Sequence, residues 1–449
     1  MTSHPAAHRG KPRKAAAAAW IGSALEYYDF FIYGTAAALV FNKIFFPASS
    51  PATGTLLALA TFGVGYLARP IGAFVLGHIG DVFGRKRVLV QTVLLMGVAT
   101  VLVGCLPTYQ QIGVAAPALL VALRLLQGFS AAGEQAGANS MSLEHAPSNR
   151  RAYYTSFTLS GTQAGQILAT AVFLPVAALP EEHLLTWGWR VPFWLSAAVV
   201  VAGLVIRRKL DETPVFEQEV AAGETKRAKT PLAPLFRDHW ADVLRVVMAS
   251  VIAAVSTIFT VYALSYAVNT VGLERSPILW VGVLANIAAL ITIPLWARLA
   301  DRIGRKPVFI GGSLGCAVLM AAYLWSLSIG DHALIFLTGI LMFGVVYSAT
   351  NGIWPAFYGE MFPARVRLSG MAVGTQIGFA VAGFAPSIAE AVGGGRDGWM
   401  NVALFTAGLC ALNAVAVATG RETYRVPTEE LGLKSPKAKG ERDRSAVSA

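Results

Sequence analysis

Apolar residues gather in twelve long runs, separated by short stretches that contain charged residues, proline or glycine. A helix needs about 20 apolar residues to cross a bilayer, and each run has roughly that length. The runs are continuous, whereas strands of a transmembrane β-barrel alternate polar and apolar residues. The pattern predicts an all-α polytopic membrane protein with twelve transmembrane helices, at 18–44, 54–78, 88–106, 114–142, 152–178, 189–207, 243–268, 278–299, 307–328, 333–359, 368–392 and 399–419.

The composition also indicates a membrane protein. Hydrophobic residues fill 55% of the 449 positions and charged residues only 14%, whereas soluble domains carry about 25% charged residues. The polar residues 1–14 precede an apolar run that is too long for a signal peptide, so we expect a retained first helix. The cysteines lie far apart in apolar runs and predict neither a disulfide framework nor a metal site; they are Cys105, Cys316 and Cys410.

The positive charge of the chain has a topological explanation. Thirty of the 36 lysine and arginine residues fall in the two tails or in the even-numbered connections between predicted helices. The odd-numbered connections hold only Lys43, Arg190, Arg275 and Arg396. Because cytoplasmic loops are rich in lysine and arginine, both termini are predicted to be cytoplasmic. The net charge of +11 then requires no nucleic-acid partner.

The chain divides into two halves of six predicted helices. The stretch 208–241 is a cytoplasmic linker between helical bundles at 15–207 and 242–420, with tails at 1–14 and 421–449. GHIGDVFGRK follows the second helix and ARLADRIGRK the eighth, while EHAPSNRR and EMFPARVR follow the fourth and the tenth. Both pairs recur at nearly the same offset, which indicates a parallel repeat. Such repeats place a substrate site between the halves near the bilayer midplane.

The repeated loop motifs predict a gate at the cytoplasmic face. Glycines permit a tight turn between two helices, and an acid can accept hydrogen bonds from nearby helix ends or arginines. The alternative is a simple positive-inside anchor, which would need no aspartate. The predicted gating residues are Asp81, Arg85, Lys86, Glu144, Arg151, Asp301, Arg305, Glu360 and Arg367.

Longer stretches resemble one transporter family. The matching segments include EYYDFFIYG (26–34), ATFGVGYLARPIGAFVLGHIGD (60–81), RLLQGFSAAGE (124–134), WGWRVPF (187–193) and LDETPVF (210–216). Together with the loop motif, they resemble the metabolite:proton symporters of the major facilitator superfamily over residues 15–420. The resemblance implies the major facilitator fold and transport of metabolites of the shikimate, α-ketoglutarate, citrate or proline/betaine type.

Five ionisable residues lie at membrane depth, where charge is costly and therefore points to function. Glu26 and Asp29 share one face of the first helix. The resemblance implies that an acid of the first helix acts opposite an arginine of the fourth, so Asp29, Arg124 and Glu26 are the predicted proton-coupling residues. The alternative for Asp29 and Arg124 is a buried ion pair that only locks helices together. The remaining two residues are Arg69 and Glu134.

Amide and aromatic side chains of the second half are predicted to face the charges of the first. Arginines match a carboxylate, and aromatic rings can bind a quaternary ammonium. Amides at helix contacts are an equally common structural arrangement. The predicted substrate-binding residues are Arg69, Arg124, Gln127, Glu134, Gln163, Tyr262, Tyr266, Asn351 and Trp354.

The sequence therefore predicts a monomeric transporter of the plasma or inner membrane. It would carry a small carboxylate-bearing metabolite or zwitterionic osmolyte together with protons, by alternating access, with membrane lipids as its other partners. We expect no enzyme activity, cofactor or metal. One alternative is an exporter or antiporter, although Gln166 replaces the proline of the G-x-x-x-G-P-x-x-G-G signature of drug antiporters. The other is a sensor that binds a ligand in the same cavity without moving it.

The predicted topology can be tested by labelling single cysteines introduced into a variant without the native ones. Cysteines replacing Lys43 and Arg275 should react with an impermeant reagent on intact cells. A cysteine replacing Lys226 should react only after permeabilisation, because the charge distribution places it in the cytoplasm. The reverse labelling pattern would rule out the twelve-helix topology.

Overall fold

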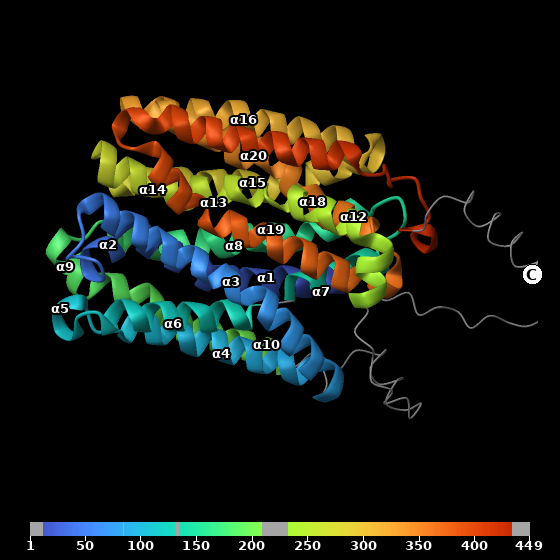
Figure 1. Cartoon of the computed structure of the whole chain (residues 1–449), viewed down its shortest axis with the longest axis horizontal. Helices are drawn as coiled ribbons and strands as arrows, with labels where there is room; N and C mark the ends of the chain where they lie inside the picture. Colours follow the sequence, from blue (N-terminus) through green and yellow to red (C-terminus); the bar gives the residue numbers. More distant parts are fainter. Residues whose placement is uncertain (1–11, 84, 132–133, 209–231, 433–449) are drawn as a thin grey trace, which may run out of the picture.

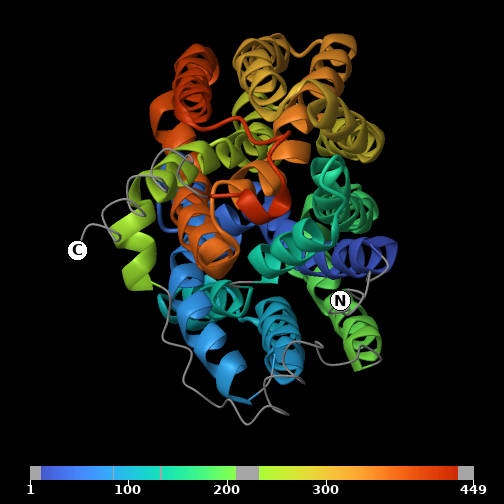
Figure 2. The same ribbon diagram turned by 90° about the vertical axis from the view of Figure 1, so that its right-hand side faces the viewer.

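The computed structural model describes residues 12–83, 85–131, 134–208 and 232–432. This part of the chain is helical and contains no strand. Most helices run along the long axis of the molecule, with α4, α6 and α10 on one side and α16 and α20 on the other (Figure 1). Helices of both halves lie between these outer groups, and the end-on view shows them clustered around the centre (Figure 2). The predicted all-α fold with twelve transmembrane helices is confirmed.

The helices follow the predicted runs closely. The first half contains α1 (Pro12–Leu39), α3 (Pro51–Phe83), α4 (Arg85–Cys105), α6 (Ala115–Ser130) with α7 (Glu134–His145), α8 (Arg151–Ala177) and α10 (Val191–Arg208). The second half contains α12 (Leu232–Ser250) continued by α13 (Ala253–Thr257), η2 (Ile258–Tyr262), α14 (Ala263–Ser265) and η3 (Tyr266–Val271), then α15 (Arg275–Ile303), α16 (Arg305–Ile329), α17 (His332–Gly339) with η4 (Ile340–Tyr347) and α18 (Ser348–Glu360), α19 (Ala364–Gly393) and α20 (Trp399–Thr419). Short helices at one end are α2 (Phe41–Ile44), α5 (Tyr109–Ile112) and α9 (Glu181–Thr186).

Most of the long described helices are apolar enough for a membrane environment. Eight helical stretches of the described chain are long and apolar enough to cross a membrane. All six helices of the second half qualify, but only Pro51–Gly72 and Gly188–Val205 qualify in the first. Two further helical stretches of the first half, Val90–Cys105 and Ala115–Ser130, are apolar but shorter among the described residues.

Two boundaries differ from the prediction. The first helix ends at Leu39, because the chain leaves helical geometry at Val40 before the short helix α2. Helix α12 begins at Leu232, inside the stretch predicted as a linker, and reaches the bundle through a break in helical geometry at His239 (φ −130°, ψ 18°). The prediction missed this segment because its charged and proline residues interrupt the apolar pattern.

The seventh and tenth transmembrane helices contain π-helical segments. They are η2 and η3 in the seventh and η4 in the tenth. A π-helical turn inside an α-helix widens the backbone and frequently marks a functional site. Both helices belong to the second half, and η2 borders the central pocket described below.

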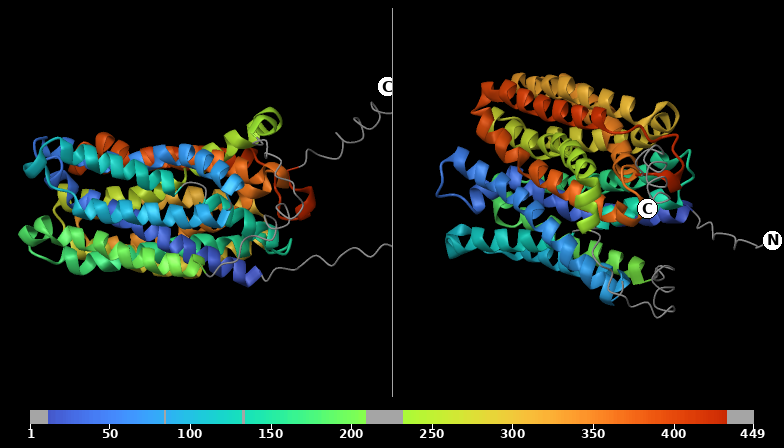
Figure 3. Two further views of the ribbon diagram at one scale, coloured as in Figure 1. Left: turned by 90° about the horizontal axis from the view of Figure 1, so that it is seen from below. Right: turned by 45° about the vertical axis from the view of Figure 1, so that its right-hand side comes forward.

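Close helix contacts hold the bundle together. Within the first half, α1 packs along α8, and across the two halves α8 packs along α15 and α3 along α19; the nearly parallel course of the helices is visible in two further views (Figure 3). A Cβ atom on Gly161 would lie 2.3 Å from the carbonyl oxygen of Trp20, and one on Gly165 would lie 2.4 Å from that of Ala24. Small residues let membrane helices approach this closely.

Replacing Gly165 by alanine should therefore destabilise the protein. The added methyl group overlaps the α1 backbone, and overpacking of this kind costs about 1–3 kcal/mol. Thermal unfolding of the purified protein in detergent should show a lower midpoint for Gly165→Ala. The matched control is Gly408→Ala in α20, where a Cβ atom meets nothing within 4 Å, and its midpoint should not fall. Equal midpoints for the two variants would contradict the α1–α8 contact.

Candidate functional site: buried charges, a central pocket and a gate

Arg124 is fully buried in the first half, and aromatic rings surround its guanidinium. Its Cζ atom lies 4.1 Å from the ring centroids of both Phe30 and Tyr33 and 5.1 Å from that of Phe62. Nη1 donates to Gln127 Oε1 (3.1 Å), and Nη2 donates to the carbonyl oxygen of Phe62 (3.3 Å). Nε has no hydrogen-bond partner among the described residues. A buried guanidinium with an unused N–H group can donate a charge-assisted hydrogen bond to an anionic group.

Arg69 forms the other side of the same arrangement. It is 1% exposed, and its Cζ atom lies 4.5 Å from the Phe30 centroid and 4.7 Å from the Tyr66 centroid. Both arginines therefore contact the ring of Phe30. Arg69 Nη2 lies 3.8 Å from Glu26 Oε1, which makes this the ion pair that joins α1 to α3.

Asp29 has a different partner from the predicted one. Its buried carboxylate accepts a hydrogen bond from the hydroxyl of Ser196 on α10. No ion pair within 4 Å joins Asp29 to Arg124, both of which are fully described. Arg124 instead contacts Gln127, whose Nε2 donates to Thr100 Oγ1 (2.8 Å). The direct opposition of Asp29 and Arg124 expected from the resemblance is thus replaced by polar contacts with neutral side chains.

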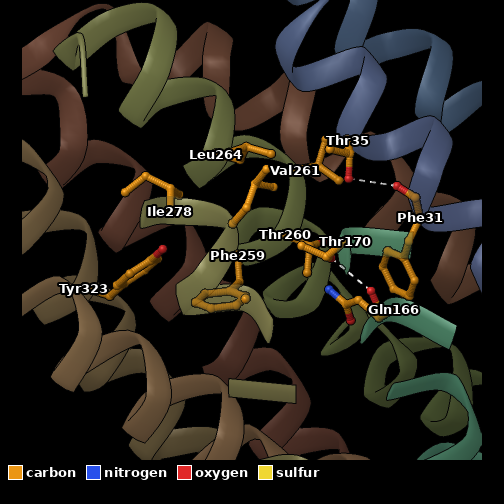
Figure 4. A pocket seen from close by; sticks show the side chains of 12 residues that line it. Phe31, Thr35, Gln166, Thr170, Phe259, Thr260, Val261, Leu264, Ile278 and Tyr323 are labelled. Carbon is orange, nitrogen blue, oxygen red and sulfur yellow. Dashed lines mark hydrogen bonds between the residues drawn. The ribbon is translucent and has the colours of Figure 1, made fainter. Parts of the chain in front are cut away.

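A pocket of about 30 Å³ lies between the two halves, and none of its twelve lining residues is charged. Figure 4 shows Phe31 and Thr35 from α1 facing Phe259 and Thr260 of η2, with side chains of α8, α15 and α16 around them. Its polar groups are the hydroxyls of three threonines and one tyrosine and the amide of one glutamine, contributed by Thr35, Thr170, Thr260, Tyr323 and Gln166. The pocket therefore offers hydroxyl and amide groups within an otherwise apolar lining.

The predicted substrate-binding residues do not line this pocket. Gln163 is buried and its Nε2 lies 3.3 Å from Thr162 Oγ1, whereas Gln166, one turn later, borders the pocket. Tyr262 and Tyr266 stack with centroids 5.8 Å apart, and the Tyr266 hydroxyl donates to the carbonyl oxygen of Arg396 (2.6 Å).

On the tenth helix, Trp354 Nε1 donates to Asn351 Oδ1 (3.3 Å), and the Trp354 ring lies 5.4 Å from that of Tyr358. Both residues are buried. The side chain of Glu134 lies outside the described part of the structure. The expected cluster of charged and aromatic groups is thus divided between the first-half core, the pocket region and separate helix contacts.

The six predicted gating residues whose side chains are described lie together at one end of the bundle. Glu360 on α18 is fully buried and binds arginines from both halves: Arg151 Nε lies 2.6 Å and Arg305 Nη2 lies 3.0 Å from Oε1. Arg305 Nη1 also lies 2.7 Å from Asp301 Oδ1. A buried carboxylate is tolerated when charge and hydrogen bonds compensate it, as the two arginines do here. We call the end of the molecule that carries this cluster the gate end.

A second set of contacts crosses the halves at the gate end. The carboxylate of Asp301 accepts backbone N–H groups of Ala152 (3.2 Å) and Tyr153 (3.0 Å) at the start of α8. Arg367 Nη1 lies 3.1 Å from Glu144 Oε1, at positions equivalent by the sequence repeat to Arg151 and Glu360. An acid at a helix N-terminus is favoured by the helix dipole. These contacts therefore join the two halves at the gate end.

Three predicted gating residues remain without structural information about their contacts. The side chains of Asp81, Arg85 and Lys86 lie outside the described residues. At the opposite end, Asn269 Nδ2 donates to the carbonyl oxygen of Ala38 (2.9 Å), so a hydrogen bond joins the halves there as well. Within the described chain, no group of three or more His, Cys, Asp or Glu residues could hold a metal ion.

Two bundles of six helices, a pocket between them and a charged cluster that joins them at one end are the arrangement of a membrane transporter of the major facilitator type. The chain belongs to the sugar (and other) transporter family of this superfamily, whose family model matches residues 15–432. The fold resembles the proton:xylose symporter XylE, with a TM-score of 0.73 at 18% identity over 94% of this chain and 98% of that one.

Curated relatives are more similar in sequence. The chain is 36% identical to the shikimate transporter of Escherichia coli over 419 residues, which is 92% of this chain and 96% of the relative. It is 33% identical to the proline/betaine transporter of Salmonella typhimurium over 390 residues, covering 85% and 77% of the two chains. The protein is thus a transporter and not an enzyme.

Removing one side of the buried gate cluster should loosen the gate end. Arg151→Gln leaves Glu360 with less compensating charge, and breaking a buried pair in this way costs about 3–5 kcal/mol. Hydrogen–deuterium exchange of peptides at the start of α8 and the end of α18 should become faster. The control is Arg245→Gln, which removes an ion pair with Asp242 inside the second half alone and should leave those peptides unchanged. Unaltered exchange in Arg151→Gln would show that this cluster does not hold the gate.

Proposed function

We propose that the protein is a proton-coupled symporter that imports a small carboxylate-bearing metabolite or zwitterionic osmolyte by alternating access. The observation that carries the proposal is the pair of buried acids in α1, close to two buried arginines, in a bundle that is closed at one end by charged contacts between its halves. Charge at membrane depth is retained when it serves transport or coupling.

Asp29 is the proposed proton site, with Glu26 and Arg124 as its coupled neighbours. The Asp29 carboxylate accepts a hydrogen bond from the Ser196 hydroxyl and forms no ion pair with a described side chain. Protonation of Asp29 therefore does not have to break an ion pair. Glu26, by contrast, is held 3.8 Å from Arg69. The two acids thus have unlike surroundings, which separates their roles.

Arg69 and Arg124 are the proposed source of anion selectivity. Each has an N–H group without a hydrogen-bond partner among the described residues. The arginine fork matches a carboxylate. The central pocket, which neither arginine lines in this state, offers hydroxyl and amide groups to the polar body of a solute. The names of the two relatives, a shikimate transporter and a proline/betaine transporter, support both a carboxylic acid and a zwitterion as candidates.

The gate end is proposed to be the cytoplasmic side, with both termini cytoplasmic, in the plasma or inner membrane. The motifs of the gate end fall in the connections that are rich in lysine and arginine, as the positive-inside rule requires. The structure would then represent a state closed to the cytoplasm. A single chain contains both halves of the proposed pathway, so we propose that a monomer with its surrounding lipids is sufficient.

Asp29→Asn should abolish uphill uptake and preserve exchange. One proton moving through about 100 mV supplies about 2.3 kcal/mol, which sustains roughly fiftyfold accumulation in the parent protein. An amide cannot carry that proton, so reconstituted Asp29→Asn should equilibrate substrate without concentrating it. The accumulation ratios of the parent protein and of Asp29→Asn are measured as uptake of radiolabelled substrate into proteoliposomes under a proton gradient and a membrane potential.

Glu26→Gln is the control for that experiment, since it removes an acid from the same helix face. It should keep pH-dependent accumulation above equilibrium if Asp29 is the site. Accumulation retained in Asp29→Asn and lost in Glu26→Gln would transfer the proton site to Glu26.

Substrate class can be tested with a competition panel of small carboxylic acids, betaine, neutral sugars and aromatic drugs. Acids or betaine should compete, because Arg124 places a positive charge within a ring of aromatic side chains. Arg124→Ala should weaken their uptake by about tenfold or more, the effect of losing a charge-assisted hydrogen bond. Robust uptake of a neutral sugar that is insensitive to Arg124→Ala would contradict the carboxylate assignment.

A further inference from the structure

A second cavity lies entirely within the first half. It has a volume of about 20 Å³ and is enclosed by α1, α4, α6 and α10. A cavity needs roughly 10–15 Å³ to hold a water molecule, so this one has space for one. Its polar lining consists of two carboxylates and two hydroxyls, which belong to Glu26, Asp29, Thr92 and Ser130.

The two cavities lie on different faces of α1. Leu25, Glu26 and Asp29 border the cavity in the first half, whereas Phe31 and Thr35 border the central pocket. At 100° per residue these two groups point about 150° apart around the helix axis. Helix α1 therefore separates the cavity with the acids from the pocket between the halves.

The lining of each cavity fits a different solute. The central pocket has no charged lining residue, while both acids of α1 border the cavity in the first half. A water molecule there has enough acceptors and hydroxyls for the two to four hydrogen bonds that buried water needs. Glu26 and Asp29 are one helical turn apart, close enough for a proton to pass through one water.

We propose that protons leave Asp29 toward the gate end through this cavity in the first half, past Glu26, Thr92 and Ser130, without entering the substrate pocket. The proposal rests on Asp29 being the proton site of the proposed symporter. In the transfer, the neutral carboxylic acid of Asp29 gives its proton to a water molecule in the cavity, which leaves the Asp29 carboxylate and one hydronium ion. The Ser196 hydroxyl holds the Asp29 carboxylate toward α10, and α10 also lines this cavity through Val199 and Val200.

The surrounding charges are compatible with this route. The described charged groups on the elements around Asp29 are Glu26 on α1, Arg69 on α3 and Arg124 on α6. The described parts of α4 and α10 near the cavity carry no charged side chain. Both arginines contact Phe30, the residue between Asp29 and the pocket-lining Phe31, so a small rotation of α1 would alter the proton side and the substrate side together.

The route can be tested without knowing the substrate. Infrared difference spectra of the purified full chain, recorded between low and high pH, should contain a carboxylic acid band that is missing in Asp29→Asn. Transfer to deuterated buffer then gives the exchange rate of that acid. Thr92→Leu fills the cavity and removes a hydroxyl, so it should slow the exchange about tenfold, the effect of losing one hydrogen bond from the path. Thr92→Ser keeps the hydroxyl and should exchange at the parent rate.

The matched control is Thr260→Leu, which fills the central pocket and should leave the exchange rate of the Asp29 acid unchanged. If Thr92→Leu does not fold, Thr92→Val and Val199→Leu test the hydroxyl and the volume separately. Slower exchange in Thr260→Leu, or unchanged exchange in all cavity variants, would overturn the separate route and leave Asp29 as the proton site. Absence of any Asp29-dependent band would instead contradict the proposed proton site itself.

Discussion

The cost of placing charge inside a membrane is the constraint on which this structure depends. A charged side chain at the bilayer centre raises the free energy by several kcal/mol unless it is compensated. Two solutions occur here. At the gate end, Glu360 is compensated by arginines from both halves, so its burial requires that the halves meet. In the first half, aromatic rings and neutral polar groups surround Arg124, and its charge is compensated without a carboxylate in contact.

These two solutions have different consequences for motion. A cluster that joins the halves stabilises one arrangement of the bundle, and any movement that separates the halves exposes Glu360 and Arg151 to water. Their contact energy therefore contributes to the difference between the two states and not to binding. A charge held inside one half moves with that half as a unit. Its energy responds to protonation and to an arriving anion, which is the property that a coupling site needs.

The sequence predicted the architecture well because hydropathy and loop charge report directly on a membrane environment. It also predicted the gate residues that the structure brings together, since a repeated motif at both positions carries more information than one occurrence. The boundaries failed where polar residues enter a helix, as at Leu232. The residues that line the pocket were harder to predict. Gln163 and Gln166 have the same side chain, and only the packing of α8 decides which of the two borders the pocket. Ser196 was missed because a serine in an apolar helix carries no signal until its partner across the bundle is known.

Proton-coupled symport requires that protons and substrate move together in the same direction. The most direct measurement is the internal pH of proteoliposomes that contain a trapped pH-sensitive dye, after substrate is added outside without any ion gradient. Symport predicts that the lumen becomes acidic as substrate enters, and that Asp29→Asn lets substrate equilibrate without this acidification. A lumen that becomes alkaline would indicate antiport, and substrate entry without any pH change in the parent protein would contradict coupling to protons.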